Sequence, residues 1–110
     1  MSAPNPRVRE EMRQILIAVS EVWGVSVEEI IERDRHKTVS EARCVVYWLA
    51  RKTTRLSYPE IGRAVGNRDH TTILAGAVMI ERRRKADAWL SANLNAILDV
   101  LNPAEQVTVQ

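Results

Sequence analysis

A Ser/Thr-x-x-Glu pattern occurs three times in this chain, each time before a segment whose apolar residues have helical spacing. The pattern is typical of a helix N-terminus, because the hydroxyl accepts a hydrogen bond from a backbone amide three residues on and the Glu carboxylate accepts one in return. The three copies are Ser26 with Glu29, Thr38 with Glu41, and Ser57 with Glu60. Each copy predicts the start of a helix, so the middle of the chain is divided into helices.

The apolar residues of the chain repeat with the period of a helix. In residues 7–23 they are separated by one or three positions, the spacing of an amphipathic helix with one buried side. They are Met12, Ile15, Leu16, Val19, Val22 and Trp23. Further core faces are predicted at Ala42, Val45, Val46, Leu49 and Thr53; at Ile73, Leu74, Ala77 and Ile80; and at Leu90, Leu94, Ile97, Leu98 and Leu101. Because no segment shows sustained β alternation, we expect an all-α fold of about six helices.

The length of 110 residues suits one domain with a single modest core. We expect a flexible lead at residues 1–6, one helical domain at 7–101 and a loose tail at 102–110. The single cysteine, Cys44, excludes an internal disulfide and fits a reducing, cytoplasmic location. No stretch approaches the roughly 18 apolar residues of a membrane span, so no membrane partner is expected.

Positive charge is concentrated in the middle of the chain. The formal net charge is only +2, but residues 31–85 hold 13 Lys/Arg against 6 Asp/Glu. Residues 1–30 hold 3 Lys/Arg against 5 Asp/Glu, and residues 86–110 hold no Lys/Arg against 3 Asp/Glu. Such clustering is expected of a surface that binds phosphates. A solvated charged surface without a partner gives the same pattern, so charge alone does not decide between the two.

The reactive side chains do not form a recognisable catalytic or metal site. His36, His70 and Cys44 stand at unrelated spacings, whereas a metal site needs three or four convergent ligands. A phosphate-binding loop of the GxxxxGK[ST] type is absent. Spacing leaves a Cys44–His70 nucleophile pair open, but a cysteine among apolar helical neighbours is more often a packed hydrophobe. We therefore expect no enzymatic activity, metal, cofactor or small-molecule substrate.

Residues 57–72 have the features of a helix-turn-helix. A short helix after Ser57 tolerates Pro59 in its first turn. It ends at Gly66, a residue suited to the left-handed position that follows a helix. Asp69 is then the predicted N-cap of a second helix.

The start of this second helix is a run of polar residues: Arg68, Asp69, His70, Thr71 and Thr72. Local capping explains Asp69 alone, but two adjacent threonines are mediocre helix formers. A threonine offers both a hydroxyl and a methyl to a base edge, including the thymine methyl. Together with their place in a helix-turn-helix, these residues predict readout in a DNA major groove.

The chain resembles the C-terminal, DNA-binding domain of the bacterial replication initiator DnaA. The resemblance rests on GNRDHTTIL at residues 66–74 and SYPEIG at residues 57–62, and it extends over about residues 7–101. It implies an all-helical domain whose helix-turn-helix binds short, asymmetric DnaA boxes in double-stranded DNA as a monomer.

The resemblance also implies roles for individual residues. Major-groove contacts fall on Arg68, Asp69, His70, Thr71 and Thr72. Arg35 matches an arginine that inserts into the adjacent minor groove, where a narrow A·T groove has enhanced negative potential. Phosphate contacts fall on Lys37, Arg43, Arg51, Tyr58 and Pro59. Independently of the resemblance, the predicted core face around Val45 and Leu49 makes Arg43 and Arg51 point largely outward. Asn67 stands where a glycine is usual, and asparagine tolerates the same left-handed conformation.

The sequence contains no counterpart of the AAA+ ATPase module of a full initiator. A complete protein of this length would bind boxes as a competitor, regulator or accessory, whereas a fragment would leave ATP-driven origin opening to its parent. The start Met1-Ser2-Ala3-Pro4 favours a complete short protein. Two alternatives stay open: a helix-turn-helix transcriptional regulator of unrelated sites, and a protein-interaction module that has lost DNA binding.

Overall fold

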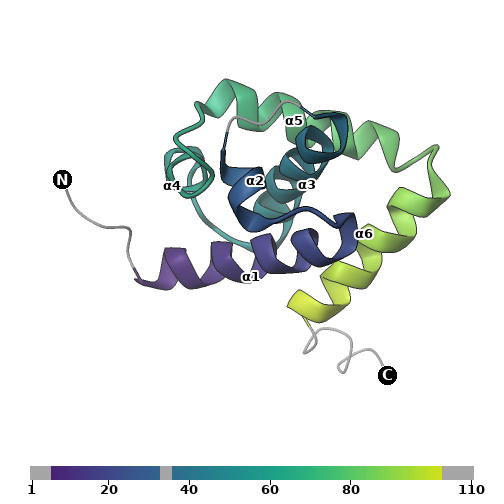
Figure 1. Ribbon diagram of the computed structural model, residues 1–110, viewed down its shortest axis with the longest axis horizontal. Helices are drawn as coiled ribbons and strands as arrows, with labels where there is room; N and C mark the ends of the chain where they lie inside the picture. Colours follow the sequence, from purple (N-terminus) through teal and green to yellow (C-terminus); the bar gives the residue numbers. More distant parts are fainter. Residues whose placement is uncertain (1–5, 33–35, 103–110) are drawn as a thin grey trace.

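The computed structural model describes residues 6–32 and 36–102, which form six α-helices. They are α1 (Pro6–Trp23), α2 (Val27–Ile31), α3 (Lys37–Thr53), α4 (Tyr58–Ala64), α5 (His70–Arg83) and α6 (Ala88–Leu101). Figure 1 shows α1 and α5 on opposite sides of the molecule, with α3 between them. The predicted all-α fold is confirmed. None of the helices in the described ranges has the length and apolar character that spanning a membrane requires.

Local capping sets the start of several helices as the sequence predicts. Ser26 Oγ accepts a hydrogen bond from the Glu29 amide (3.0 Å), and Glu29 Oε1 accepts one from the Ser26 amide (2.8 Å). Ser57 and Glu60 form the same reciprocal pair at the start of α4. Asp87 caps α6 through its side chain. These contacts are formed within four residues, so the sequence pattern is sufficient to predict them.

The capping box predicted at Thr38 is wrong. α3 begins at Lys37, and no side-chain hydrogen bond caps it. The Glu41 carboxylate, which the box would use, instead accepts a hydrogen bond from Trp23 Nε1 (2.7 Å) and pairs with Arg83 (2.7 Å). The Glu41 carboxylate is therefore engaged by residues far away in the sequence and does not cap α3.

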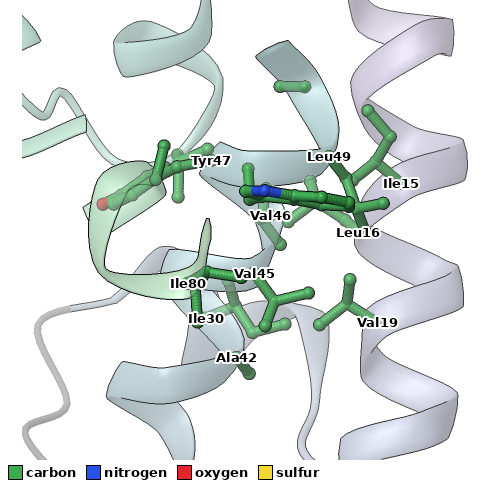
Figure 2. Close-up of a cluster of buried hydrophobic side chains, with 14 of the residues drawn as sticks. Ile15, Leu16, Val19, Ile30, Ala42, Val45, Val46, Tyr47, Leu49 and Ile80 are labelled. Atoms are coloured by element: carbon green, nitrogen blue, oxygen red, sulfur yellow. The ribbon is translucent and has the colours of Figure 1, made fainter. Parts of the chain in front are cut away.

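The centre of the core is α3. Its buried residues are Val39, Ala42, Val45, Val46, Tyr47, Trp48, Leu49 and Ala50. Figure 2 shows several of them between Ile15, Leu16 and Val19 of α1 and Ile80 of α5. These buried residues lie on several sides of α3, whereas the sequence spacing predicts a single buried face. Thr53, placed on that face, is only half-buried and donates its hydroxyl to the Leu49 carbonyl (2.8 Å).

The predicted core face of α5 is wrong at Leu74, which is 40% exposed. The buried residues of this helix are Ile73, Gly76, Ala77 and Ile80. A Cβ atom on Gly76 would lie 2.8 Å from the Tyr47 ring and 3.0 Å from Cys44 Sγ. The bare backbone of Gly76 thus lets α3 approach on that side, and Leu74 is left at the edge of the contact.

Two clusters, each of a tryptophan, a carboxylate and an arginine, fix α5 beside α3. The Glu41 cluster comprises Trp23, Glu41 and Arg83. The Glu81 cluster comprises Trp48, Glu81 and Arg84, with Trp48 Nε1 donating to Glu81 (2.8 Å) and Arg84 bridging both carboxylate oxygens. Hydrogen bonds from Arg84 and then from Trp48 lower the pKa of Glu81 to about 2, so its carboxylate is ionised at neutral pH.

Candidate nucleic-acid interface

The turn between α4 and α5 depends on close backbone packing. Gly66 and Asn67 both have left-handed conformations, with φ of 77° and 62°. Asparagine therefore accommodates position 67, as predicted. The Arg68 amide donates to the Gly62 carbonyl (3.0 Å), and a Cβ on Gly62 would overlap the Arg68 carbonyl. The turn at Arg68 thus packs directly against the backbone of α4.

The first turn of α5 presents its polar side chains to solvent. Asp69 is the N-cap, and its Oδ1 accepts a hydrogen bond from the Thr72 amide (2.8 Å). This bond lowers the pKa of Asp69, so the cap stabilises the fold at neutral pH and is lost as pH falls through that lowered pKa. His70, Thr71 and Thr72 are exposed. The Thr72 hydroxyl also helps to lower the pKa of Asp69, and all three exposed side chains can reach a molecule bound at this end of α5.

Three of the predicted contact residues come together beside the start of α5. The Arg51 guanidinium lies 5.6 Å from the centroid of the Tyr58 ring. The Tyr58 ring in turn lies 6.3 Å from the ring of His70. Pro59 is exposed next to Tyr58 at the start of α4. A cation, two rings and the exposed threonines of α5 therefore form one continuous surface.

Arg43 and Arg68 have structural partners at the end of α2. Arg43 Nε donates to the Ile30 carbonyl (2.7 Å), and its Nη2 donates to the Glu32 carbonyl (2.7 Å). Arg68 Nη2 donates to the same Glu32 carbonyl (2.7 Å) and to that of Ile31 (3.2 Å). The outward orientation expected for Arg43 is therefore wrong. The DNA contacts assigned to both residues stay predictions.

The remaining predicted contacts lie around the connection between α2 and α3. Arg35, the predicted minor-groove residue, lies outside the described residues. Lys37 is exposed at the first position of α3. Because Arg68 binds the carbonyls of Ile31 and Glu32, the end of α2 is held next to the start of α5. The turn before α5 is thus bound to the C-terminal end of α2.

The alternative nucleophile pair of Cys44 and His70 finds no support in the geometry. Cys44 is half-buried next to Gly76, nearly two helical turns along α5 from His70. Burial raises the pKa of the Cys44 thiol, which disfavours the nucleophilic thiolate. Within residues 6–32 and 36–102, no three His, Cys, Asp or Glu side chains are close enough to hold a metal ion.

Sequence reasoning missed a set of cations near Arg51. Lys52, Arg82 and Lys85 line one groove together with Arg51, between the ends of α3 and α5. The basic run at residues 82–85 is visible in the sequence. Its proximity to Lys52 is not, because it depends on the angle at which α5 crosses α3.

Comparison with known proteins identifies relatives of this arrangement. The family model described as "Bacterial dnaA protein helix-turn-helix" matches residues 12–80. The chromosomal replication initiator protein DnaA of Lachnoclostridium phytofermentans is 31% identical over 101 residues, which are 92% of this chain and 22% of that protein. The DnaA protein of Caulobacter sp. (strain K31) is 35% identical over 98 residues, covering 84% of this chain and 20% of that protein.

A solved structure agrees with these matches. The crystal structure of a DNA replication initiation factor superposes with a TM-score of 0.73 and 30% identity, over 86% of this chain and 30% of that one. The chain spans about a fifth of the length of its curated DnaA relatives. The match to the family model begins at Met12 within α1 and runs through α2, α3, α4 and the turn to Ile80 of α5. The chain therefore belongs to the family of bacterial DnaA helix-turn-helix domains.

Proposed function

We propose that this chain binds double-stranded DNA sequence-specifically, through α4 and α5, at sites like DnaA boxes. The observation that carries the proposal is the first turn of α5, where His70, Thr71 and Thr72 are exposed on the second helix of a helix-turn-helix. Such helices place their N-terminal side chains against base edges in the major groove. We further propose that each site is bound by one copy of the chain.

The proposed contacts divide into base readout and positioning. Asp69, His70, Thr71 and Thr72 would contact base edges. Arg51, Tyr58, Pro59 and Lys37 would contact phosphates, and Arg35 the minor groove. For Arg43 and Arg68 we propose a positioning role, since their guanidinium groups bind the carbonyls at the end of α2.

Binding to DNA is an equilibrium that needs no ATP hydrolysis, and we propose none for these 110 residues, whose sequence has no P-loop motif. Relatives that are named chromosomal replication initiators support a role in replication initiation or its regulation. The predicted extents of the domain, at residues 7–101, and the cytoplasmic location stay predictions.

The proposal predicts salt-sensitive binding to a duplex that contains a DnaA box. Each phosphate neutralised by a cation should contribute about −0.9 to the slope of log affinity against log salt. The measurement is a fluorescence-anisotropy titration at several salt concentrations, with a duplex of permuted sequence as the control. Equal affinity for both duplexes would contradict specific recognition, and a slope near zero would contradict phosphate contact.

A second prediction separates readout from positioning. Thr72→Ala and His70→Ala should each weaken binding to the preferred site by on the order of 1–3 kcal/mol, with little change on the permuted duplex. Arg51→Ala should weaken both duplexes about equally, because a phosphate contact carries no sequence information. The measurement is the affinity of each variant for both duplexes.

Thermal melting of the same variants provides the control. Asp69 accepts a hydrogen bond from the Thr72 backbone amide, which alanine keeps; alanine removes only the added effect of the exposed Thr72 hydroxyl on Asp69. Alanine is also the better helix former. The melting temperature of Thr72→Ala should therefore stay near that of the parent. A large drop in melting temperature with unchanged sequence preference would assign Thr72 to capping instead of readout.

A further inference from the structure

A basic groove of about 390 Å³ lies between the C-terminal halves of α3 and α5. Four cations line it: Arg51 and Lys52 from α3, Arg82 from α5, and Lys85 just beyond α5. Its other walls are Trp48, Ala77, Val78 and Glu81. The lining of the groove thus combines four cations with one carboxylate and three apolar or aromatic side chains.

Most of the positive charge of the basic groove is uncompensated. Glu81 is its only acidic wall residue, and Arg84 binds both oxygens of that carboxylate (3.0 and 2.8 Å). The Lys52 ammonium lies 5.4 Å from the centroid of the Trp48 ring, a contact that leaves its charge in place. In the part of the chain that the structure describes, the side chains of Arg82 and Lys85 form no ion pair. The groove therefore favours an anion with several charges in a row.

The basic groove is continuous with the proposed DNA surface through Arg51. Arg51 also lines a neighbouring hollow of about 360 Å³ together with Tyr58 and Pro59. Its guanidinium lies over the Tyr58 ring, which is next to His70. A phosphate strand at Arg51 would therefore reach the basic groove without crossing an acidic surface.

We propose that the basic groove binds the phosphate backbone of the duplex that flanks the recognised site. The inference rests on the proposed function, and it extends the DNA contact along the length of α5. Arg82 follows His70 by twelve residues, which is about 18 Å along a helix. At about 3.4 Å per base pair, the added contact covers roughly five base pairs. Because Arg51 and Tyr58 lie on one side of α5, only one flank of the site is contacted.

Flank sequence should not matter, because the groove is proposed to hold the sugar–phosphate backbone and not the base edges. Phosphate contacts position the duplex and carry no sequence information. DNA is favoured over an acidic peptide because a duplex already present at Arg51 supplies regularly spaced charges to the groove.

The test uses four duplexes with the same DnaA box: a minimal one, two that are each extended by about six base pairs at a different end, and one extended at both ends. Extension at one end only should raise the affinity and steepen the salt slope, by about 0.9 for each added phosphate contact. The triple variant Lys52→Gln, Arg82→Gln, Lys85→Gln should lose this gain and still bind the minimal duplex as the parent does. Arg51 is left unchanged because it belongs to the site already proposed.

A matched control removes three positive charges from α1, on the opposite side of the molecule, by Arg7→Gln, Arg9→Gln and Arg13→Gln (Figure 1). This variant should keep the gain from the extension. The inference is overturned if extension gives no gain, if either end gives the same gain, or if both variants lose it equally. Box-specific binding of the minimal duplex would survive each of these results. Loss of box specificity on every duplex would instead overturn the proposed function.

Discussion

Gly66→Ala should lower the free energy of unfolding by about 2–5 kcal/mol, as measured by urea denaturation. Two costs add at this position. Gly66 has φ of 77°, and the left-handed region costs a residue with a Cβ roughly 1–2 kcal/mol. The new Cβ would also overlap the Ile31 carbonyl, and overpacking of this kind costs about 1–3 kcal/mol.

Gly24→Ala is the matched control for this prediction. Gly24 has a similar φ of 68°, but a Cβ there would meet no atom within 4 Å. Its substitution should therefore cost only the backbone part, roughly 1–2 kcal/mol. If the two variants were equally stable, the Ile31 carbonyl would have to move away at no cost. In that case, close packing of the turn on α2 would not be what requires glycine at position 66.

Removing either Arg43 or Arg68 should lower the free energy of unfolding by about 1.5–3 kcal/mol, the usual contribution of hydrogen bonds made by charged groups. Both guanidinium groups donate to the Glu32 carbonyl at 2.7 Å, and each also binds a neighbouring carbonyl of α2. The substitutions are Arg43→Ala, Arg68→Ala and the double variant, with stability measured by urea denaturation. Because both arginines bind the Glu32 carbonyl, the two losses of stability should not add. The coupling free energy between the two substitutions should be about 0.5–3 kcal/mol.

Arg68→Lys tests whether charge or hydrogen-bond geometry is required. A lysine keeps the charge but cannot make the forked contacts of a guanidinium. We expect Arg68→Lys to recover little of the lost stability. Normal stability with a large loss of DNA affinity would contradict the positioning role and would favour direct contact of Arg68 with DNA.

Local interactions explain what could be predicted from the sequence. The caps formed by Ser26, Ser57 and Asp69 use partners three residues away, so their patterns are complete in the sequence. The helix-turn-helix was also predictable, because its turn needs Gly66 and a left-handed residue at Asn67.

The errors came from contacts between residues far apart in the chain. Glu41 looks like a capping residue, but its carboxylate is taken by Trp23 and Arg83. Arg43 looks like a solvated cation, but its carbonyl partners are 11 to 14 residues away. Leu74 has core spacing, yet the close approach at Gly76 shifts the contact away from it. Each case depends on how helices pack, which no local pattern contains.

The Glu41 and Glu81 clusters restrict rotation of α5 about its own axis. They join Arg83 of α5 to Glu41 of α3, and Glu81 of α5 to Trp48 of α3. Because the backbone hydrogen bonds of a helix make it turn as one body, a roll of α5 would carry Thr71 and Thr72 through the same angle as Glu81 and Arg83. Contacts at the C-terminal end of α5 therefore determine the direction in which the side chains of its first turn point. A helix already held in one orientation loses little entropy when a duplex binds, which makes pre-organisation part of its affinity.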